Sequence, residues 1–407
     1  MSTDLSAELS AKFPPKRNSA RPFDPPDQLL ALLSQPLVRI RQWDGVNAWL
    51  IARYEDVRSV LNSANFSADP RKPGYPEKSA AYGATVGQDH NLRTMDEPEH
   101  GVQKRMLLQD FSVKRVNELR PAIQAKVDQL LDDMIAKGPP AEFVHDFALA
   151  IPTMVICELL GVPYADRDYF AEQTAICLSS DHPAEVGAAA GRNLSEYIDR
   201  LLDVKDATPE NDLLSRLVVE QLRTGALSRK DVVGLARLIL IAGHETTANT
   251  IALSTLALLI NPDQAQILRA GTDAATLSNA IDELLRYLSV THTGRRRVAI
   301  ADVEINGQLI RAGEGVIILT NIADRDERIF DGAAKLDLKR KNARNLMTFG
   351  TGSHRCLGAF LSKVELEIAH STLWRRLPGF RLACPFEQIE FIESGQVLGV
   401  RRLPVAW

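Results

Sequence analysis

The sequence predicts a mainly α-helical protein with a minor β part, folded as one domain over residues 1–407. Three observations support this. Apolar residues recur at helical spacing at about 114–137, 147–160, 165–179, 183–203, 211–223 and 229–260. Short strand-like segments occupy about 296–305, 308–310 and 315–319. There is no internal repeat, low-complexity segment or interdomain linker, and residues 1–27 form a polar, proline-rich N-terminal segment.

Composition excludes several classes of protein. The 407 residues are 45% hydrophobic and 25% charged, with a net charge of −4, so nucleic acid and anionic membranes are not indicated as partners. Four scattered cysteines without a CxxC pair predict neither a disulfide framework nor a zinc site. Residues 1–27 lack the apolar stretch of a signal peptide. Polar residues interrupt the longest apolar region, 232–260, so we expect no membrane span and a cytoplasmic protein.

The N-terminal third contains a hairpin, a long loop and a helix start. Residues 37–41 alternate in polarity, Asp44 and Gly45 mark a turn, and residues 48–51 return as a strand. Residues 67–94 show no period and predict a long irregular loop, which in compact domains is often functional. Asp96 to His100 resembles a helix start, with acidic residues and a proline.

The helix over 229–260 is predicted to cross the core, because apolar residues occur nearly all round it. Ser228 with Asp231 forms a capping signal before it, and Pro262 follows it. Its middle reads Ala242-Gly243-His244-Glu245-Thr246-Thr247, where a buried carboxyl is costly without partners. A hydrogen-bonded polar kink explains these residues as well as a reactive site does, since mid-helix threonines bond to the preceding turn.

An acid and an arginine, Glu283 and Arg286, share one helical face at spacing i, i+3. Apolar neighbours predict that the pair is buried, where the arginine needs more acceptors than one carboxylate provides. The following residues, 321–347, are largely irregular and charged.

Residues 349–358 read Phe-Gly-Thr-Gly-Ser-His-Arg-Cys-Leu-Gly, and a helical pattern starts at Leu357. Glycines permit sharp turns, and a helix N-terminus favours a thiolate over a thiol. A lone cysteine is usually a small buried apolar residue. The complete ten-residue pattern, however, resembles the cysteine loop of the cytochrome P450 family. Residues 242–247 resemble that family's oxygen-binding groove motif, and Glu283 with Arg286 resembles its ExxR pair.

The resemblance covers nearly the whole chain and implies the cytochrome P450 fold, with a long central helix over a haem and a small β-sheet region. It implies haem b (iron protoporphyrin IX) as cofactor, with the Cys356 thiolate as iron ligand. Glu245 and Thr246 would be catalytic, delivering protons on the side of the haem where dioxygen binds. Residues with a structural role in haem retention would be Glu283, Arg286 and Arg340.

Further residues are implied to bind the cofactor or the substrate. Cations and donors for the haem carboxylates would be His100, Lys104, Arg297 and His354. Lys104 stands where the family usually has arginine, and Arg105 could partly substitute for it. Ala242 and Gly243 would allow close approach of the haem. Candidate substrate-pocket residues, mostly small or apolar, are Leu238, Ala242, Val290, Thr291, His292 and Leu398.

The resemblance implies a monooxygenase that hydroxylates or epoxidises a largely hydrophobic small molecule. No GxGxxG motif follows a strand, so electrons would come from a separate ferredoxin and ferredoxin reductase. We expect a monomer. Two alternatives stay open: an NADH-dependent nitric oxide reductase of the same family, and a non-catalytic haem sensor or carrier.

Overall fold

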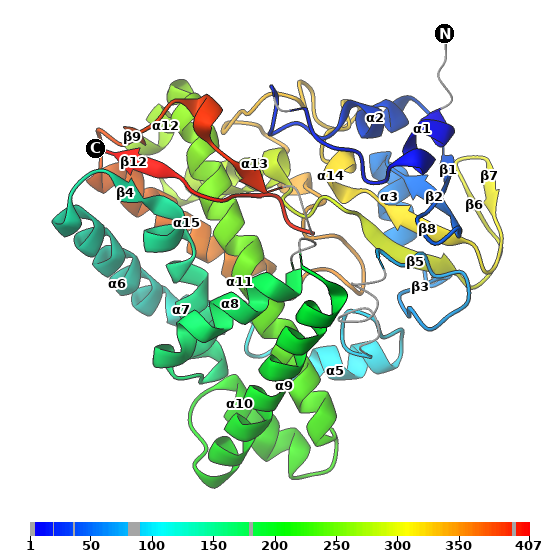
Figure 1. Cartoon of the computed structure of the whole chain (residues 1–407), viewed down its shortest axis with the longest axis horizontal. Helices are drawn as coiled ribbons and strands as arrows, with labels where there is room; N and C mark the ends of the chain where they lie inside the picture. The colour runs from blue at the N-terminus through cyan, green and yellow to red at the C-terminus, as the bar shows by residue number, and fades with distance from the viewer. Residues whose placement is uncertain (1–4, 19, 36, 80–89, 179–181, 393–395) are drawn as a thin grey trace. The chain divides into compact units, whose positions relative to one another are not determined.

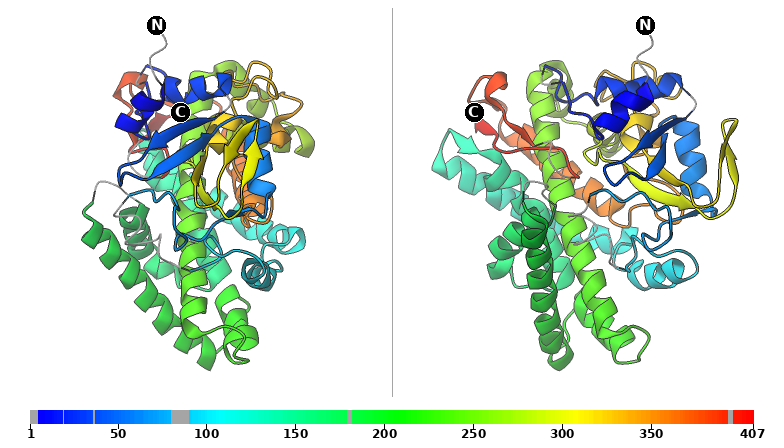
Figure 2. Two further views of the ribbon diagram at one scale, coloured as in Figure 1. Left: turned by 90° about the vertical axis from the view of Figure 1, so that its right-hand side faces the viewer. Right: turned by 45° about the vertical axis from the view of Figure 1, so that its right-hand side comes forward.

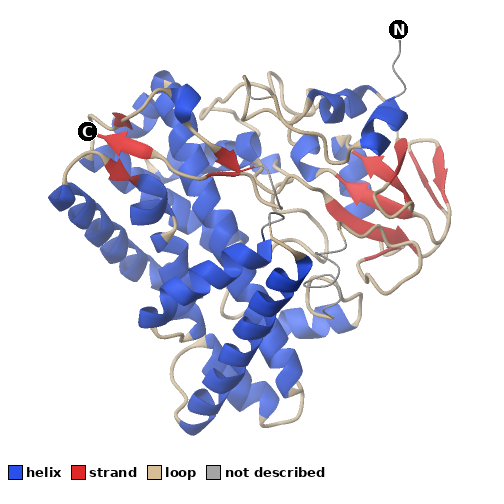
Figure 3. Cartoon of the chain, viewed as in Figure 1, coloured by secondary structure: helices blue, strands red, loops and turns tan. Residues whose placement is uncertain are grey.

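A computed structural model describes residues 5–18, 20–35, 37–79, 90–178, 182–392 and 396–407 (Figure 1). The chain divides into two compact units, which are described separately. Unit 1 comprises residues 1–97, 273–356 and 395–398, and unit 2 comprises residues 98–272, 357–394 and 399–407. The single domain expected from the sequence stays a prediction. Figure 3 shows the predicted fold class, mainly α-helical with a minor β part, since helices dominate and the strands form small sheets. Among the described residues, no helix has the length and apolarity that a membrane crossing needs.

Unit 1 contains a five-stranded sheet in the order β1-β2-β8-β5-β3 (Figure 2). β2 and β8 pair in parallel, and the other neighbours are antiparallel. The predicted hairpin is present, with Gly45 at φ 83° in its turn, where glycine avoids strain. The predicted strand over 296–305 is two strands separated by a short turn. The strands of unit 1 are β1 Val38–Arg41, β2 Asn47–Ile51, β3 Phe66–Ser67, β5 Arg295–Ala299, β6 Val303–Ile305, β7 Gln308–Ile310 and β8 Gly315–Ile318.

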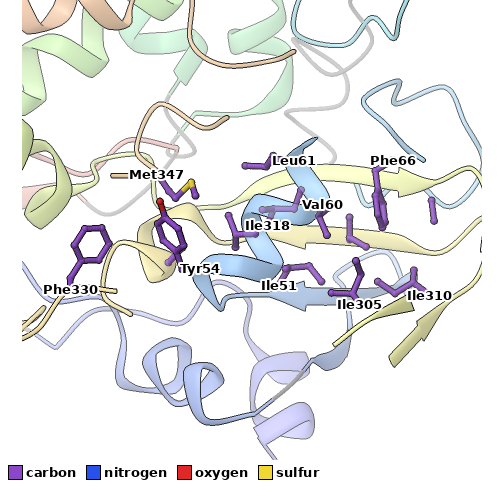
Figure 4. Packing of buried hydrophobic residues seen from close by; sticks show 14 of the residues in the cluster. Ile51, Tyr54, Val60, Leu61, Phe66, Ile305, Ile310, Ile318, Phe330 and Met347 are labelled. Atoms are coloured by element: carbon purple, nitrogen blue, oxygen red, sulfur yellow. The ribbon is translucent and has the colours of Figure 1, made fainter. Parts of the chain in front are cut away.

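Helix α3 packs on this sheet through a buried apolar cluster. Figure 4 shows Val60 and Leu61 of α3 beside Ile51, Phe66 and Ile318 of the sheet. The helices of unit 1 are α1 Leu5–Ala11, α2 Asp27–Leu30, α3 Tyr54–Asn62, α13 Ala274–Leu288 and α14 Thr320–Ala323, with 3-10 turns at Ala31–Ser34 and Ala343–Asn345. The polar N-terminal segment also contributes to the core. It contains α1, whose Leu9 is completely buried in a second cluster.

Unit 2 is largely helical, and α11 coincides with the predicted range of the long helix. Its capping box forms as expected between Ser228 and Asp231. The patterns at 147–160 and 211–223 each include a π-helical turn, because the apolar spacing alone does not distinguish the two kinds of helix. The helices of unit 2 are α5 Glu99–Leu107, α6 Val113–Lys137, α7 Ala150–Leu160, α8 Arg167–Leu178, α9 Ala184–Ala207, α10 Leu213–Leu217, α11 Arg229–Ile260, α12 Pro262–Arg269 and α15 Ala359–Arg376, with π-helical turns at Val144–Ala148 and Val218–Leu222 and 3-10 turns at Tyr164–Asp166 and Phe386–Gln388.

Short strands complete unit 2. Two sheets form, in the orders β10-β11 and β4-β12-β9. The strands are β4 Ala141–Glu142, β9 Arg381–Leu382, β10 Phe391–Ile392, β11 Gly399–Val400 and β12 Pro404–Ala406.

Polar side chains fix α11 against α15 in unit 2. Thr247 Oγ1 lies 3.2 Å from Ser362 Oγ of α15. Farther along, Ser254 Oγ lies 2.7 Å from His370 Nε2, while His370 Nδ1 accepts from Trp374 Nε1. Because Nδ1 is the acceptor, Nε2 carries the proton, and the buried imidazole is neutral. These contacts set the rotation of α11 about its axis, which decides where the 242–247 segment points.

Candidate functional site

The cysteine loop of unit 1 is closed by its own backbone. Cys356 N donates to Phe349 O at 2.9 Å, and Gly350 N donates to Met347 O at 2.8 Å. Gly350 and Gly352 have φ values of 69° and 74°, a region that other residues rarely occupy. A Cβ on Gly352 would lie 2.5 Å from Leu61 O of α3. The loop therefore requires glycine at this position, and it leaves Cys356 exposed at its end.

Two charged side chains hold the residues just before this loop. Asp324 Oδ1 accepts from Met347 N at 2.5 Å, and Asp324 Oδ2 accepts from Thr348 Oγ1 at 2.9 Å. Arg295 Nη2 donates to Thr348 O at 3.0 Å. Burial raises the pKa of Asp324 to about 6, so the group is mostly ionised near pH 7 and accepts both hydrogen bonds.

The predicted structural trio is brought together in the interior of unit 1. Arg286 makes a two-pronged ion pair with Glu283, with Nε to Oε2 at 2.7 Å and Nη2 to Oε1 at 2.8 Å. Arg340 Nε reaches the same Oε2 at 3.0 Å. Arg286 Nη1 also donates to the carbonyls of Asp324 and Ala333. The pair thereby fastens α13 to the irregular segment that precedes the cysteine loop.

Two arginines of β5 and a histidine of the cysteine loop are the predicted or candidate cationic groups of unit 1. Burial lowers the pKa of Arg297 to about 10, and Arg297 Nη1 donates to Arg296 O at 2.7 Å. Burial likewise lowers the pKa of Arg295, and the nearby Cys356 opposes that shift. Arg295 Nε is buried, without a hydrogen-bond partner among the described residues. His354 lies within the loop and is partly buried.

Two of the residues predicted to bind the haem carboxylates belong to unit 2. His100 and Lys104 are one turn apart on α5, so they share a helix face. His100 is buried, Lys104 is partly buried, and Arg105 points to solvent.

The central segment of α11 carries a carboxyl in a largely apolar setting. Burial raises the pKa of Glu245 to about 7, and the carboxyl forms no hydrogen bond within the described ranges. Thr246 Oγ1 donates to Ala242 O at 2.8 Å, the expected bond to the preceding turn. Ala242 itself is exposed.

Two residues of this segment face α7. A Cβ on Gly243 would lie 2.9 Å from Ile156 Cδ1, the end of a side chain that can shift, so packing against α7 favours glycine without requiring it, and the contact of Gly243 with the cofactor stays a prediction. His244 Nε2 lies 2.8 Å from Thr153 Oγ1, which itself donates to Leu149 O. The imidazole is therefore the donor, and burial lowers its pKa to about 4.

The candidate substrate residues of unit 1 lie on two paired segments. Thr291 forms a bridge with Val397, and Leu398 N donates to Val290 O at 2.8 Å. His292 N donates to Gln396 O. Val290, His292 and Leu398 are buried, and Thr291 is partly exposed. In unit 2, Leu238 is partly exposed on α11, one turn before Ala242.

Sequence reasoning missed Asp324 and Lys78, and it considered Arg295 only as a polar contact of the substrate, with a solvent-directed side chain as the preferred interpretation. Asp324 opens the charged run Asp-Arg-Asp-Glu-Arg, which predicts a solvated surface, although it is completely buried. Lys78 Nζ donates to Gln396 Oε1, a pairing 318 residues apart that no local pattern reveals. Arg295 had a weak signal, as the first of three consecutive arginines in a strand.

Comparison with known proteins identifies the family. The model of the family described as "Cytochrome P450" matches residues 189–406. The chain is 44% identical to "Cytochrome P450-SU2" of Streptomyces griseolus, over 97% of this chain and 96% of the relative. It is 41% identical to the "20-oxo-5-O-mycaminosyltylactone 23-monooxygenase" of Streptomyces fradiae, over 95% of this chain and 90% of the relative.

A solved structure agrees with these relatives. The mycinamicin VIII C21 methyl hydroxylase MycCI of Micromonospora griseorubida superposes with a TM-score of 0.91 at 37% identity, covering 97% of this chain and 99% of that chain. The chain belongs to the cytochrome P450 family. It is a monooxygenase of that family, an oxidoreductase whose cofactor is haem b, as the sequence indicated.

The residues of unit 1 fit this cofactor. The loop holds the Cys356 thiol in an exposed position, as a ligand of haem iron requires. The partly buried guanidinium of Arg297 forms no ion pair with a carboxylate of the described residues, so it can donate hydrogen bonds to a haem carboxylate.

We expect Gly352→Ala to lower the fraction of protein that shows the red-shifted Soret band of the reduced CO complex. The added Cβ must displace either the cysteine loop or the end of α3. The matched control is Gly307→Ala, where φ is 78° and nothing lies within 4 Å, so it carries only the left-handed strain of about 1–2 kcal/mol. Equal CO spectra of the two variants would show that the loop tolerates the displacement.

Proposed function

We propose that the chain uses haem b, ligated by Cys356, to hydroxylate or epoxidise a largely hydrophobic small molecule. The exposed Cys356 thiol on its glycine-constrained loop is the observation that carries this proposal. The hydroxylase and monooxygenase names of the relatives favour oxygen insertion over nitric oxide reduction. When bound, the haem supplies the iron at which dioxygen is activated by two electrons.

Cys356 is suited to ligation because its surroundings favour the thiolate. Arg295 is close enough to affect it electrostatically, and a nearby cation lowers the pKa of a thiol. The Phe349 carbonyl holds the Cys356 backbone, so little entropy remains to be lost when the sulfur binds a metal. We assign the haem carboxylates to Arg297 and His354 in unit 1 and to His100 and Lys104 in unit 2.

Glu245 and Thr246 supply protons in this proposal. A carboxyl with a pKa near 7 is present in both forms at neutral pH, as a general acid requires. In the structure the Thr246 hydroxyl donates to Ala242 O. A rotation about χ1 would point the hydroxyl away from the helix, where it can donate to another group. The rotation gives up one hydrogen bond, worth about 0.5–1.5 kcal/mol.

The substrate is proposed to contact the paired segments around Val290 and Leu398, together with Leu238 and Ala242 of α11. These residues are mostly apolar, which favours a hydrophobic molecule. Thr291 and His292 add polar atoms. Two of the similar proteins are named for a position on a small molecule, one as a 20-oxo-5-O-mycaminosyltylactone 23-monooxygenase and the other as a mycinamicin VIII C21 methyl hydroxylase.

Electrons are proposed to come from a separate ferredoxin and ferredoxin reductase, because the sequence contains no dinucleotide-binding fingerprint. The four cysteines are unbridged, which supports the expected cytoplasmic location. The monomeric state stays a prediction.

We expect Cys356→Ala to abolish the red-shifted Soret band of the reduced CO complex. Alanine cannot provide the thiolate on which this shift depends. The control is Cys384→Ala, which removes a partly exposed cysteine outside the loop and should leave the band unchanged. If the Cys356 variant keeps the band, the ligand is another residue.

Thr246→Ala should lower the ratio of product formed to reductant consumed by about tenfold or more, with peroxide as the by-product. Thr250→Ala is the matched control, because Thr250 Oγ1 makes the same bond to the preceding turn, at 2.7 Å from Thr246 O, but is buried. Both ratios are measured with a surrogate ferredoxin and reductase. A similar loss in both variants would point to a helix defect instead of proton delivery.

The ratio of product formed to reductant consumed should also depend on pH, because Glu245 titrates. Its pKa is raised to about 7, so the acid form is lost as the pH rises through that value, and coupling in the wild type should fall. Glu245→Gln cannot release a proton and should show a low ratio without this inflection. An unchanged pH profile in the variant would remove Glu245 from the proton path.

A further inference from the structure

A chain of hydrogen bonds joins the middle of α11 to the start of α7 in unit 2. His244 Nε2 lies 2.8 Å from Thr153 Oγ1. The Thr153 hydroxyl donates to Leu149 O at 2.6 Å, so its oxygen is left to accept from the imidazole. Leu149 N in turn donates to Val144 O at 2.8 Å, which is the i to i−5 bond of a π-helical turn. The side chain of His244 is thereby tied to the backbone of a second helix.

His244 lies on the opposite face of α11 from the candidate substrate and proton-delivery residues. Leu238, Ala242 and Thr246 follow one another at four-residue spacing, so they share a face, and each is exposed or partly exposed. An α-helix turns by about 100° per residue, which places His244 about 160° from both Ala242 and Thr246. Glu245 lies between the two faces and is partly exposed. The bond from His244 to α7 therefore decides in which direction the next two side chains point.

An apolar contact would fix this direction less sharply. α11 packs against α7 (Figure 1), and the burial of apolar surface does not depend on a particular angle between the helices. A hydrogen bond weakens steeply as its angle departs from linearity, and a buried N–H group without an acceptor is costly. Burial also lowers the pKa of His244 to about 4, so the imidazole is neutral and adds no charge beside Glu245. Its effect on that carboxyl is geometric.

A second contact holds the other end of the same segment. Thr247 Oγ1 lies 3.2 Å from Ser362 Oγ of α15, so residues 245 and 246 lie between two anchored neighbours. Ser362 is partly exposed, whereas His244 and Thr153 are 1% and 5% exposed. Water cannot readily replace either partner of the His244 bond. This bond is therefore the stronger constraint on the rotation of the segment.

We propose that His244, held by Thr153, is a positioning residue for proton delivery. Its hydrogen bond sets the rotation of α11 so that Glu245 stays in its largely apolar setting and Thr246 faces the same side as the candidate substrate residues. The inference rests on the proposed function and adds two residues that act through their neighbours. Without the bond, the segment can rotate, which brings the Glu245 carboxyl nearer to water.

The first test compares two variants of Thr153 in the haem-loaded protein. Thr153→Val has nearly the same shape but cannot accept the hydrogen bond, whereas Thr153→Ser keeps the hydroxyl. The pKa of Glu245, about 7 in the wild type, is followed by infrared difference spectroscopy as the pH is varied, with Glu245→Gln used to assign the carboxyl band. We expect Thr153→Val to lower this pKa by about one unit, a tenfold change in proton affinity, because rotation exposes the carboxyl. Thr153→Ser should keep the wild-type value.

The second test is the ratio of product formed to reductant consumed. This ratio should fall about fivefold in Thr153→Val and in His244→Leu, as expected for the loss of one hydrogen bond. His244→Gln should recover most of it, because the glutamine Nε2 can reach the same hydroxyl. Thr255→Val is the matched control, since Thr255 Oγ1 of α11 is buried without a hydrogen-bond partner among the described residues. This control should change neither the ratio nor the pKa of Glu245.

Three results would overturn the inference. One is a Thr153→Val variant in which the pKa of Glu245 is unchanged. Another is a ratio in Thr153→Val equal to that in Thr255→Val. The third is an equal loss in Thr153→Ser and Thr153→Val, which would assign the effect to packing. Failure of the proposed function would appear instead as a wild type without the red-shifted CO band. The infrared measurement needs neither substrate nor redox partner, so it decides the inference independently of that function.

Discussion

The shared carboxylate of Glu283 is the interaction on which the cysteine-bearing unit depends. Two guanidiniums, those of Arg286 and Arg340, bind it in the interior, where Glu283 and Arg286 are 0% exposed. Removing one member of such a group leaves a buried charge unpaired, which costs about 3–5 kcal/mol. Within residues 324–346 the backbone hydrogen bonds close only short local turns. Side chains, and not a sheet or helix, therefore determine where this segment lies.

Further contacts fix the residues between the Glu283 site and the cysteine loop. Arg286 holds the Asp324 carbonyl, the Asp324 carboxylate holds residues 347 and 348, and Arg295 holds Thr348 from another side. The loop then begins, and its glycines turn the chain back so that Cys356 is exposed. Each step uses a buried or partly buried charge that binds a backbone group or the Thr348 hydroxyl. Glu283 therefore determines the position of the Cys356 thiol indirectly, through the hydrogen bonds that link Arg286, Asp324 and residues 347 and 348.

Patterns within short stretches of the sequence predicted the features that depend on neighbouring residues alone. The helix at 229–260, the hairpin and the ten-residue cysteine loop all follow from periodicity, capping and glycine content. The family resemblance then supplied the cofactor and the enzyme class. The sequence did not show Asp324, because a run of charged residues predicts solvent exposure unless its distant partners are known. It did not show the pairing of Lys78 with Gln396 or the packing of Gly243 on Ile156, since each depends on the tertiary fold.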